Sequence, residues 1–291
     1  MKVFIIGHRG WIGQMYLKLF EEQKIDYTFS DNRGESDEIL DDIINSGCSH
    51  VLCVMGRTRG TLDGKTYTTI DYLENNETIH QNINDNLFVP LRIAMWLKNN
   101  PELDIHFTYM GTGCIYNYDD THTENNYNGF NDNDKPNFFG SNYSIVKGFT
   151  NELMKNTDAL VLRIRMPITD EHNPRNFITK ITKYEKICSI PNSMTVLPEM
   201  IPLSIKMMIN KDTGSYNFTN PGSISHNEIL TYYKKFVDPS FTWKNFTLEE
   251  QDQVLASKRS NNLLNTSKLT CKYHVNDIRL AVTLALDNYK V

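Results

Sequence analysis

Tyr143 and Lys147 are the residues of this chain whose types and spacing point most directly to chemistry. They lie four apart in a segment, N-Y-S-I-V-K, that predicts a helix, so their side chains share one face about one turn apart. An ammonium beside a phenol stabilises its ionised form, and such a pair can hand a proton to a carbonyl oxygen as hydride reaches the carbon. Chance often places Tyr and Lys at this spacing on a solvated helix, so the interpretation requires a dinucleotide site elsewhere in the chain.

Two further candidates follow a strand predicted over Ile105–Met110. Thr112 offers a hydroxyl that would bind the same carbonyl oxygen. Cys114 stands two residues later and could act as an acid or base. A lone cysteine is more often a small buried residue than a catalyst, so the residues alone leave both alternatives open for Cys114.

A glycine motif near the N-terminus predicts the dinucleotide site. Lys2–Ile6 reads as a strand, G-H-R-G-W-I-G follows, and an amphipathic helix continues to about Gln23. Glycines in a strand–turn–helix context let the backbone approach a pyrophosphate at the helix N-terminus, whereas the alternative is a tight turn without a ligand. The predicted cofactor contacts in this loop are Gly7, Arg9, Gly10, Trp11, Ile12 and Gly13.

The second predicted strand, Tyr27–Ser30, ends in Asp31-Asn32-Arg33. An acidic residue at this place binds the ribose 2′-hydroxyl of NAD, whereas an arginine accommodates the 2′-phosphate of NADP. Arg33, together with Arg9 in the glycine loop, favours NADPH, with NADH as the alternative. A solvated loop charge is the other interpretation of Arg33.

The remaining pattern alternates strands with helices and predicts an α/β fold with a Rossmann-type, doubly wound parallel sheet. Gly56, after a third predicted strand, is either a close-approach position beside the cofactor or a turn glycine. We expect residues 1–165 to form an NADP-binding domain and 166–291 a smaller substrate-binding lobe, some segments of which return to the sheet. The other predicted strands are His50–Val54, Ala159–Ile164 and Ser215–Asn220, and the other helices are Glu38–Ser46, about 70–99, Asn227–Phe236 and Asp277–Tyr289.

Composition excludes several other classes of protein. A net charge of −5 argues against nucleic acid or an anionic membrane as the main partner. No apolar run approaches the roughly 18 residues of a membrane span, and the N-terminal run is too short for a signal peptide. Five widely spaced cysteines without CxxC favour free thiols in the cytoplasm. The eight histidines show no metal-ligand spacing, so we predict no metal.

The motifs together resemble the extended short-chain dehydrogenases/reductases, through GxxGxxG, a hydroxyl residue after the fourth strand and Y-x-x-x-K. Longer blocks are similar to the bifunctional UDP-4-keto-6-deoxyglucose 3,5-epimerase/4-reductases over nearly the whole chain. They include G-x-x-G-W-I-G, T-G-C-I-Y, K-P-N-F-F-G-S-x-Y-S, R-x-R-M-P-I, N-P-R-N-F-I-T-K-I and I-P-N-S-M-T-V-L. The resemblance is weakest over 57–76 and at His8-Arg9 in the N-terminal turn.

This resemblance implies roles for individual residues. Thr112, Tyr143 and Lys147 fall on the reductase triad, and Cys114 and Lys180 fall on the acid/base pair for epimerisation. Without the resemblance, Lys180 would read as a surface lysine, and Asn176 and Arg259 as an ordinary cap and a surface charge. The implied substrate-binding residues are Thr58, Asn176, Val196 and Arg259.

The resemblance also implies a substrate, UDP-4-keto-6-deoxyglucose, which the chain would convert to UDP-L-rhamnose with NADPH. We expect a separate UDP-glucose 4,6-dehydratase to supply it, because one reductase fills the 291 residues, and we expect a homodimer. Two other functions stay open: a monofunctional 4-ketoreductase similar to dTDP-4-dehydrorhamnose reductase, and a non-catalytic NADP-binding regulatory subunit. The sequence does not decide between UDP and dTDP.

Overall fold

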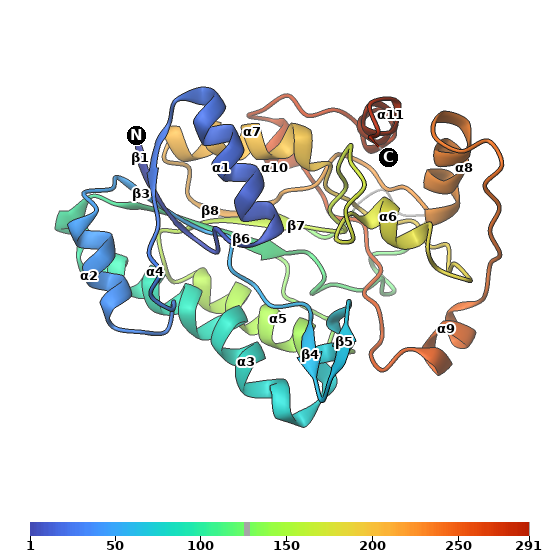
Figure 1. Cartoon of the computed structure of the whole chain (residues 1–291), viewed down its shortest axis with the longest axis horizontal. Coiled ribbons are helices and arrows are strands. Elements are labelled where there is room, and N and C mark those ends of the chain that lie inside the picture. The colour runs from blue at the N-terminus through green and yellow to red at the C-terminus, as the bar shows by residue number, and fades with distance from the viewer. Residues whose placement is uncertain (125–128, 291) are drawn as a thin grey trace. The chain divides into compact units, whose positions relative to one another are not determined.

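A six-stranded sheet, in the order β2-β1-β3-β6-β7-β8, runs through the protein (Figure 1). The computed structural model describes residues 1–124 and 129–290. Strand β1 pairs in parallel with β2 and β3, and β3 pairs in parallel with β6. The strands of this sheet are β1 (Lys2–Ile6), β2 (Asp26–Thr28), β3 (His50–Cys53), β6 (His106–Thr112), β7 (Leu160–Ile164) and β8 (Gly214–Asn217).

The strand order reverses at β1, because the chain leaves β1 for β2 on one side and returns to β3 on the other. In doubly wound sheets the carboxyl ends of the strands at such a switch point bind the nucleotide. The predicted Rossmann-type α/β class is therefore confirmed. The five strands predicted before residue 165 all exist, and their ends agree with the prediction to within two residues.

The predicted helices exist near their expected positions but differ in detail, whereas the helices over Phe177–Ile181, Leu197–Ile209, Leu248–Val254 and Ser267–Thr270 were not predicted. The helix predicted over about 70–99 opens as two 3₁₀ turns and continues through a π-helical segment, η3. A two-stranded hairpin of β4 (Gly60–Leu62) and β5 (Lys65–Tyr67) was not predicted. The helical segments are α1 (Trp11–Gln23), α2 (Glu38–Asn45), η1 (Ile70–Glu74), η2 (Asn76–Thr78), α3 (Ile79–Ile83), η3 (Asn84–Phe88), α4 (Val89–Asn99), η4 (Pro101–Leu103), α5 (Asn142–Met154), α6 (Phe177–Ile181), α7 (Leu197–Ile209), α8 (His226–Phe236), α9 (Leu248–Val254), α10 (Ser267–Thr270) and α11 (Ile278–Asp287).

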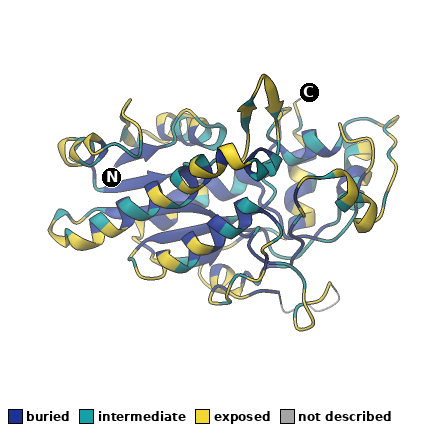
Figure 2. Cartoon of the chain, turned by 90° about the horizontal axis from the view of Figure 1, so that it is seen from below, coloured by how far each residue is buried: buried dark blue, intermediate teal, exposed yellow. Residues whose placement is uncertain are grey.

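The chain divides into two compact units, each made of three segments. The first unit comprises 1–111, 138–162 and 201–215, and the second comprises 112–137, 163–200 and 216–291. In the first unit, apolar side chains of α2, α4 and α5 pack on β1, β3 and β6 to form one core. Strands β1, β3 and β6 are buried almost throughout, whereas the helices alternate between buried and exposed positions (Figure 2).

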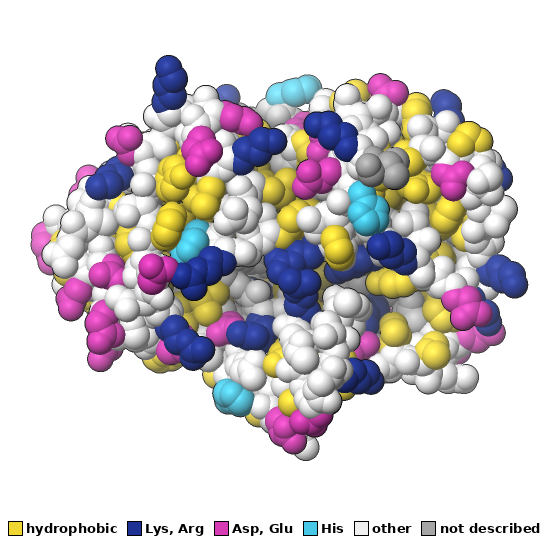
Figure 3. All heavy atoms as spheres, viewed as in Figure 1, with side chains coloured by type: hydrophobic (Ala, Val, Ile, Leu, Met, Phe, Trp, Pro, Cys, Tyr) yellow, Lys and Arg dark blue, Asp and Glu magenta, His cyan; other side chains and the backbone are white. Residues whose placement is uncertain are grey.

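The second unit has its own apolar core, built from α6, α8 and α11 together with the segments between β7 and α7. In the described part of the chain no helix is long and apolar enough to cross a bilayer. The face drawn in Figure 3 carries both acidic and basic side chains. No group of three or more His, Cys, Asp or Glu side chains in residues 1–124 and 129–290 is arranged to hold a metal ion.

Candidate active site

The glycine loop between β1 and α1 folds as a close turn that leaves the helix N-terminus open. Gly7 has φ +93°, and its carbonyl accepts a hydrogen bond from the Gly10 N–H at 2.9 Å. A Cβ on Gly7 would lie 2.8 Å from the Met55 backbone nitrogen, and one on Gly13 would lie 2.8 Å from the His8 Cα. Only glycine therefore fits at these two positions.

The first turn of α1 has the properties of an anion site. Its N-cap is Gly10, which offers no side-chain acceptor to the free backbone N–H groups, and no acidic residue lies in the first turn. The Trp11 indole Nε1 is buried and has no hydrogen-bond partner among the described residues. Free N–H donors at the positive end of a helix dipole suit a pyrophosphate, so the loop fits the predicted dinucleotide.

We expect Gly13→Ala to weaken NADPH binding by about ten- to a hundredfold. The added methyl would press on loop backbone, and overpacking of this kind costs about 1–3 kcal/mol, or tenfold per 1.4 kcal/mol. Fluorescence titration with NADPH measures the effect. Gly47→Asn is the control, because a Cβ there meets no atom within 4 Å and Asn tolerates its left-handed φ. Equal affinities for Gly13→Ala and the wild type would contradict the loop assignment.

The residues predicted to determine the preference for NADP or NAD are exposed and form ion pairs. The Arg9 guanidinium forms an ion pair with Asp31, and Arg33 pairs with Glu35 at 3.3 Å. The His8 ring stacks on Phe29 with 4.1 Å between centroids. Both arginines and the acidic residue therefore lie on the surface of the first unit, where a 2′-phosphate or a 2′-hydroxyl could compete for them.

The helix α5 is anchored at the end that carries Tyr143. The Ser141 hydroxyl caps the helix by accepting the Ser144 N–H at 3.1 Å. The Asn142 N–H donates to the Glu74 carboxylate at 2.9 Å, and the Asn142 amide donates to the Leu73 carbonyl. Tyr143 is the second residue of the helix and is 8% exposed. Its position is thus fixed by contacts to η1 within the same unit.

Lys147 lies one turn further along α5 and is buried. Its ammonium donates a hydrogen bond to the Tyr109 hydroxyl of β6 and lies 4.7 Å from the centroid of the Tyr109 ring. Burial lowers the pKa of Lys147 to about 8. A Cβ on Gly56 would lie 3.7 Å from the Lys147 Nζ and 3.3 Å from the Asn86 Oδ1, so Gly56 borders the lysine. Gly56 and Lys147 are therefore neighbours, and the roles predicted for Gly56, Tyr143 and Lys147 stay predictions.

Thr112 and Cys114 belong to the second unit, at the carboxyl end of β6. The Thr112 hydroxyl accepts a hydrogen bond from the Cys114 N–H at 3.1 Å. Cys114 is half-buried, as a group that must reach solvent or substrate requires. All five cysteines are free thiols.

A buried arginine lies beside Cys114. The Arg165 guanidinium donates to the carbonyls of Ser260 and Asn262 at 2.8 and 3.1 Å, and it also interacts with the Cys114 thiol. A Cβ on Gly113 would lie 2.9 Å from the Arg165 Cγ, so the glycine makes room for the arginine. Burial lowers the pKa of Arg165, while the hydrogen bond and charge interaction with Cys114 raise it. The guanidinium and the thiol are therefore neighbours within the second unit.

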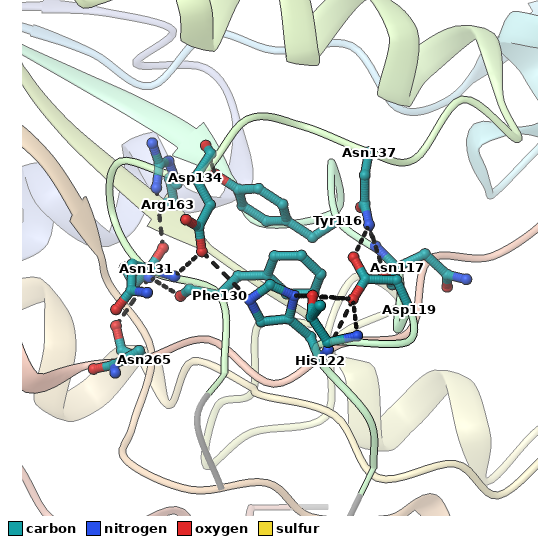
Figure 4. A network of polar contacts seen from close by, with 12 residues as sticks. Tyr116, Asn117, Asp119, His122, Phe130, Asn131, Asp134, Asn137, Arg163 and Asn265 are labelled. Atoms are coloured by element: carbon teal, nitrogen blue, oxygen red, sulfur yellow. Dashed lines mark hydrogen bonds and ion pairs between the residues drawn. The ribbon is translucent and has the colours of Figure 1, made fainter. Parts of the chain in front are cut away.

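The loop after Cys114 is held by a polar and aromatic network (Figure 4). The His122 ring stacks on Phe130 at 3.9 Å between centroids, and Phe130 stacks on Tyr116 at 4.7 Å. Partial burial raises the pKa of Asp119, but hydrogen bonds from Thr121 and His122 lower it to about 2. Asp119 is therefore a carboxylate throughout the working pH range. Its hydrogen bonds to Thr121, His122 and Asn137 hold the loop that follows Cys114 in one conformation.

The predicted substrate residues differ in their surroundings. Asn176 is fully buried and caps α6; its Oδ1 accepts the Ile178 N–H at 3.1 Å and its Nδ2 donates to the Thr169 and Glu171 carbonyls. This cap was the alternative interpretation, and a pyrophosphate contact stays a prediction.

The other three predicted substrate residues are spread through the chain. Val196 lies in the apolar core of the second unit, and the Arg259 guanidinium donates to the Ser257 carbonyl at 2.9 Å. Thr58 is exposed in the first unit. Lys180 is half-buried on α6, one turn after Asn176. The roles predicted for these residues stay predictions.

Two residues of the site, Tyr109 and Arg165, carried no role in the sequence analysis. Arg165 had a detectable signal, because A-L-V-L-R-I-R places two arginines two residues apart on an otherwise apolar strand. Fully buried arginines need partners, and these two are the largest fully buried side chains among the described residues. Tyr109 had no signal, since an aromatic residue in a buried strand is ordinary packing.

The comparisons with known proteins place the chain in a family. No family model matches it. The uncharacterized protein L780 of Acanthamoeba polyphaga mimivirus is 48% identical over 280 residues, which cover 94% of this chain and 93% of that protein. The bifunctional dTDP-4-dehydrorhamnose 3,5-epimerase/dTDP-4-dehydrorhamnose reductase of Arabidopsis thaliana is 44% identical over 272 residues, covering 92% and 86%. This chain belongs to the nucleotide-rhamnose 3,5-epimerase/4-reductase family.

A solved structure supports the family assignment. The crystal structure of the L780 UDP-rhamnose synthase from the same mimivirus matches with a TM-score of 0.93 and 46% identity, covering 99% of both chains. A trifunctional UDP-glucose 4,6-dehydratase/UDP-4-keto-6-deoxy-D-glucose 3,5-epimerase/UDP-4-keto-L-rhamnose-reductase of Arabidopsis thaliana is 43% identical, and the match covers 94% of this chain but 40% of that protein. The epimerase/reductase family therefore occurs both as single chains and within larger ones.

Proposed function

We propose that this protein is a bifunctional 3,5-epimerase/4-keto-reductase that converts UDP-4-keto-6-deoxy-D-glucose to UDP-L-rhamnose. The observation that carries the proposal is the presence of two different proton-transfer groups in one chain. Tyr143 and Lys147 suit the reduction of a ketone, and Cys114 beside Arg165 suits the abstraction of a proton from carbon. Relatives that are named for both activities are more than 40% identical over more than nine-tenths of this chain.

In the reduction, three residues act on the oxygen at C4. The Thr112 hydroxyl binds it, Tyr143 donates its proton, and the Lys147 ammonium stabilises the tyrosinate that is left. Bound NADPH supplies the hydride to C4. The glycine loop, with its open α1 N-terminus, binds the pyrophosphate of the cofactor.

In the epimerisation, the 4-keto group acidifies the hydrogens at C3 and C5. A base removes each hydrogen through an enolate, and an acid returns a proton from the opposite face of the ring. We assign these two functions to Cys114 and Lys180, and the Arg165 guanidinium lies against the Cys114 thiol. Thr58, Asn176, Val196 and Arg259 are our proposed contacts or supports for the sugar nucleotide.

We infer that NADPH is the preferred cofactor, because Arg9 and Arg33 are exposed cations next to the predicted ribose position. Replacing both with alanine should raise the KM for NADPH by about tenfold or more while leaving that for NADH nearly unchanged. Hydrogen bonds from a charged donor contribute about 1.5–3 kcal/mol, and 1.4 kcal/mol is tenfold. Initial rates with both cofactors measure the ratio, and Lys18→Ala on the exposed face of α1 is the control. An unchanged NADPH/NADH ratio would contradict the inference.

We infer a homodimer, because a row of large apolar side chains is exposed on α3, η3, α4 and α5, which pack together in the first unit. The row consists of Ile79, Ile83, Phe88, Met95, Phe149 and Leu153. An apolar surface of this kind is typical of a protein–protein interface. Phe149→Glu should convert a dimer to monomers in light scattering, whereas Ile44→Glu, an exposed apolar residue on α2, should not. A monomeric wild-type protein in the same light-scattering measurement would contradict this inference.

A partner enzyme and a cellular location follow from the proposed reaction. A UDP-glucose 4,6-dehydratase must supply the 4-keto sugar, and in the trifunctional Arabidopsis relative that activity belongs to the same protein. We propose the cytoplasm as the site of the reaction, because free thiols persist in a reducing compartment. Fractionation of the native host cell tests this location.

The purified protein should oxidise NADPH only when the 4-keto sugar nucleotide is present, and chromatography with a standard should identify UDP-L-rhamnose. Formation of a 6-deoxyhexose with unchanged C3 and C5 would favour the monofunctional reductase. NADPH binding without turnover would favour the regulatory subunit. Comparing UDP- and dTDP-linked substrates decides the nucleotide, on which the names of the relatives differ.

A further inference from the structure

Lys147 is a buried ammonium without a carboxylate partner among the described residues. It is 5% exposed, and burial lowers its pKa to about 8, so the fold itself disfavours the charge. A lysine that stabilises a tyrosinate must nevertheless keep its proton at working pH. Some neighbouring group must therefore stabilise the ammonium.

Tyr109 is the neighbour with the required geometry. It lies on β6 and is 1% exposed, its hydroxyl accepts the Lys147 hydrogen bond, and its ring faces the ammonium at 4.7 Å. The Tyr109 O–H is oriented toward the Asn86 carbonyl at 3.5 Å, which turns the oxygen lone pairs toward Lys147. A phenol oxygen and an aromatic face are both favourable neighbours for a cation.

Tyr109 does not itself donate protons. Burial, together with the charges of Cys53 and Tyr143, raises its pKa well above 10. Burial also raises the pKa of Cys53, the thiol on β3 that faces the same lysine, to about 11. Between pH 6 and about 9 these two groups are therefore neutral, and of Cys53, Tyr109 and Lys147 the lysine titrates in this range.

We propose that Tyr109 is a positioning residue for the reductase step, holding the Lys147 side chain as an ammonium beside Tyr143. It acts through the lysine and touches neither substrate nor cofactor. This proposal rests on the proposed function of Lys147 in the reduction.

The variant Tyr109→Phe tests the proposal, because it keeps the ring and removes only the hydroxyl. The Asn86 carbonyl stays satisfied by the Thr150 hydroxyl at 2.7 Å, so the loss leaves no orphaned acceptor there. In the wild type, the reduction rate should be constant below pH 8 and fall as the pH rises through about 8, since Lys147 then loses its proton. In Tyr109→Phe this fall should move to lower pH by about one unit or more, because a hydrogen bond to a charged group is lost.

Two controls separate positioning from packing. Tyr16→Phe removes another buried hydroxyl of the first unit, one that contacts Ser204, and should leave the pH profile unchanged. Lys147→Arg should remove the fall near pH 8, since a guanidinium keeps its proton, and adding Tyr109→Phe to it should shift nothing further. Thermal melts confirm that each variant is folded.

A Tyr109→Phe profile that is lower at every pH, with its fall at the wild-type pH, would overturn the proposal and leave Tyr109 a packing residue. A fall near pH 8 that persists in Lys147→Arg would instead contradict the function proposed for Lys147. The two failures are thus distinct.

Discussion

Cys114→Ala should lower the incorporation of solvent deuterium at C3 and C5 of the 4-keto sugar by about 10²- to 10⁴-fold, the contribution of a positioned acid or base. Under the proposed function the half-buried thiol next to the Arg165 guanidinium is one of the two groups that move these protons, so its loss should slow the exchange. NADPH affinity should not change, because the glycine loop belongs to the other unit. Mass spectrometry of the recovered sugar measures the exchange.

The matched control for this prediction is Cys188→Ala, which removes another half-buried thiol of the second unit. It should exchange deuterium at the wild-type rate. Wild-type exchange in Cys114→Ala would contradict the assignment of Cys114 and return it to the role of a packing residue. The monofunctional reductase would then be the better account of the chain.

Tyr143→Phe should lower the rate of NADPH oxidation by about 10²- to 10⁴-fold with little change in NADPH affinity. Under the proposed function the phenol donates the proton to the C4 oxygen, and Tyr143 lies on a helix whose first turn is fixed by Ser141 and Asn142. A phenylalanine keeps these backbone contacts. Stopped-flow absorbance at 340 nm measures the oxidation, and calorimetric titration measures the affinity.

Tyr16→Phe, with a buried hydroxyl elsewhere in the first unit, is the control for this second prediction. Near-wild-type turnover by Tyr143→Phe would show that another group protonates the C4 oxygen. Loss of NADPH affinity in step with turnover would instead assign Tyr143 to cofactor binding alone.

Much of the fold could be predicted because the local patterns and the global arrangement agree. The apolar run Lys2–Ile6 followed by spaced glycines admits few structures other than strand, turn and helix, and β1 and α1 have the predicted ends. The π-helical segment η3 had no local signal, because Asn84–Phe88 reads as ordinary helix and its widened turn is not encoded in apolar spacing. The hairpin β4–β5 was missed because G-T-L-D-G-K-T-Y is short and largely exposed.

The site was predictable where spacing along one element fixes it and obscure where the fold brings distant segments together. Tyr143 and Lys147 share a helix face, so four residues of spacing sufficed. The contacts of Lys147 to Tyr109 and of Cys114 to Arg165 join segments 38 and 51 positions apart, beyond the reach of periodicity. For Asn176 the residue type predicts a helix cap as readily as a ligand contact, so the sequence could not decide between them. In the structure its side chain caps α6.

The most direct test of the central claim is incubation of the protein with UDP-4-keto-6-deoxyglucose and NADPH in deuterated water, followed by NMR of the product. We predict UDP-L-rhamnose with deuterium at both C3 and C5, which requires epimerisation and reduction by one chain. An unlabelled 6-deoxyhexose with the configuration of the substrate at C3 and C5 would contradict the account.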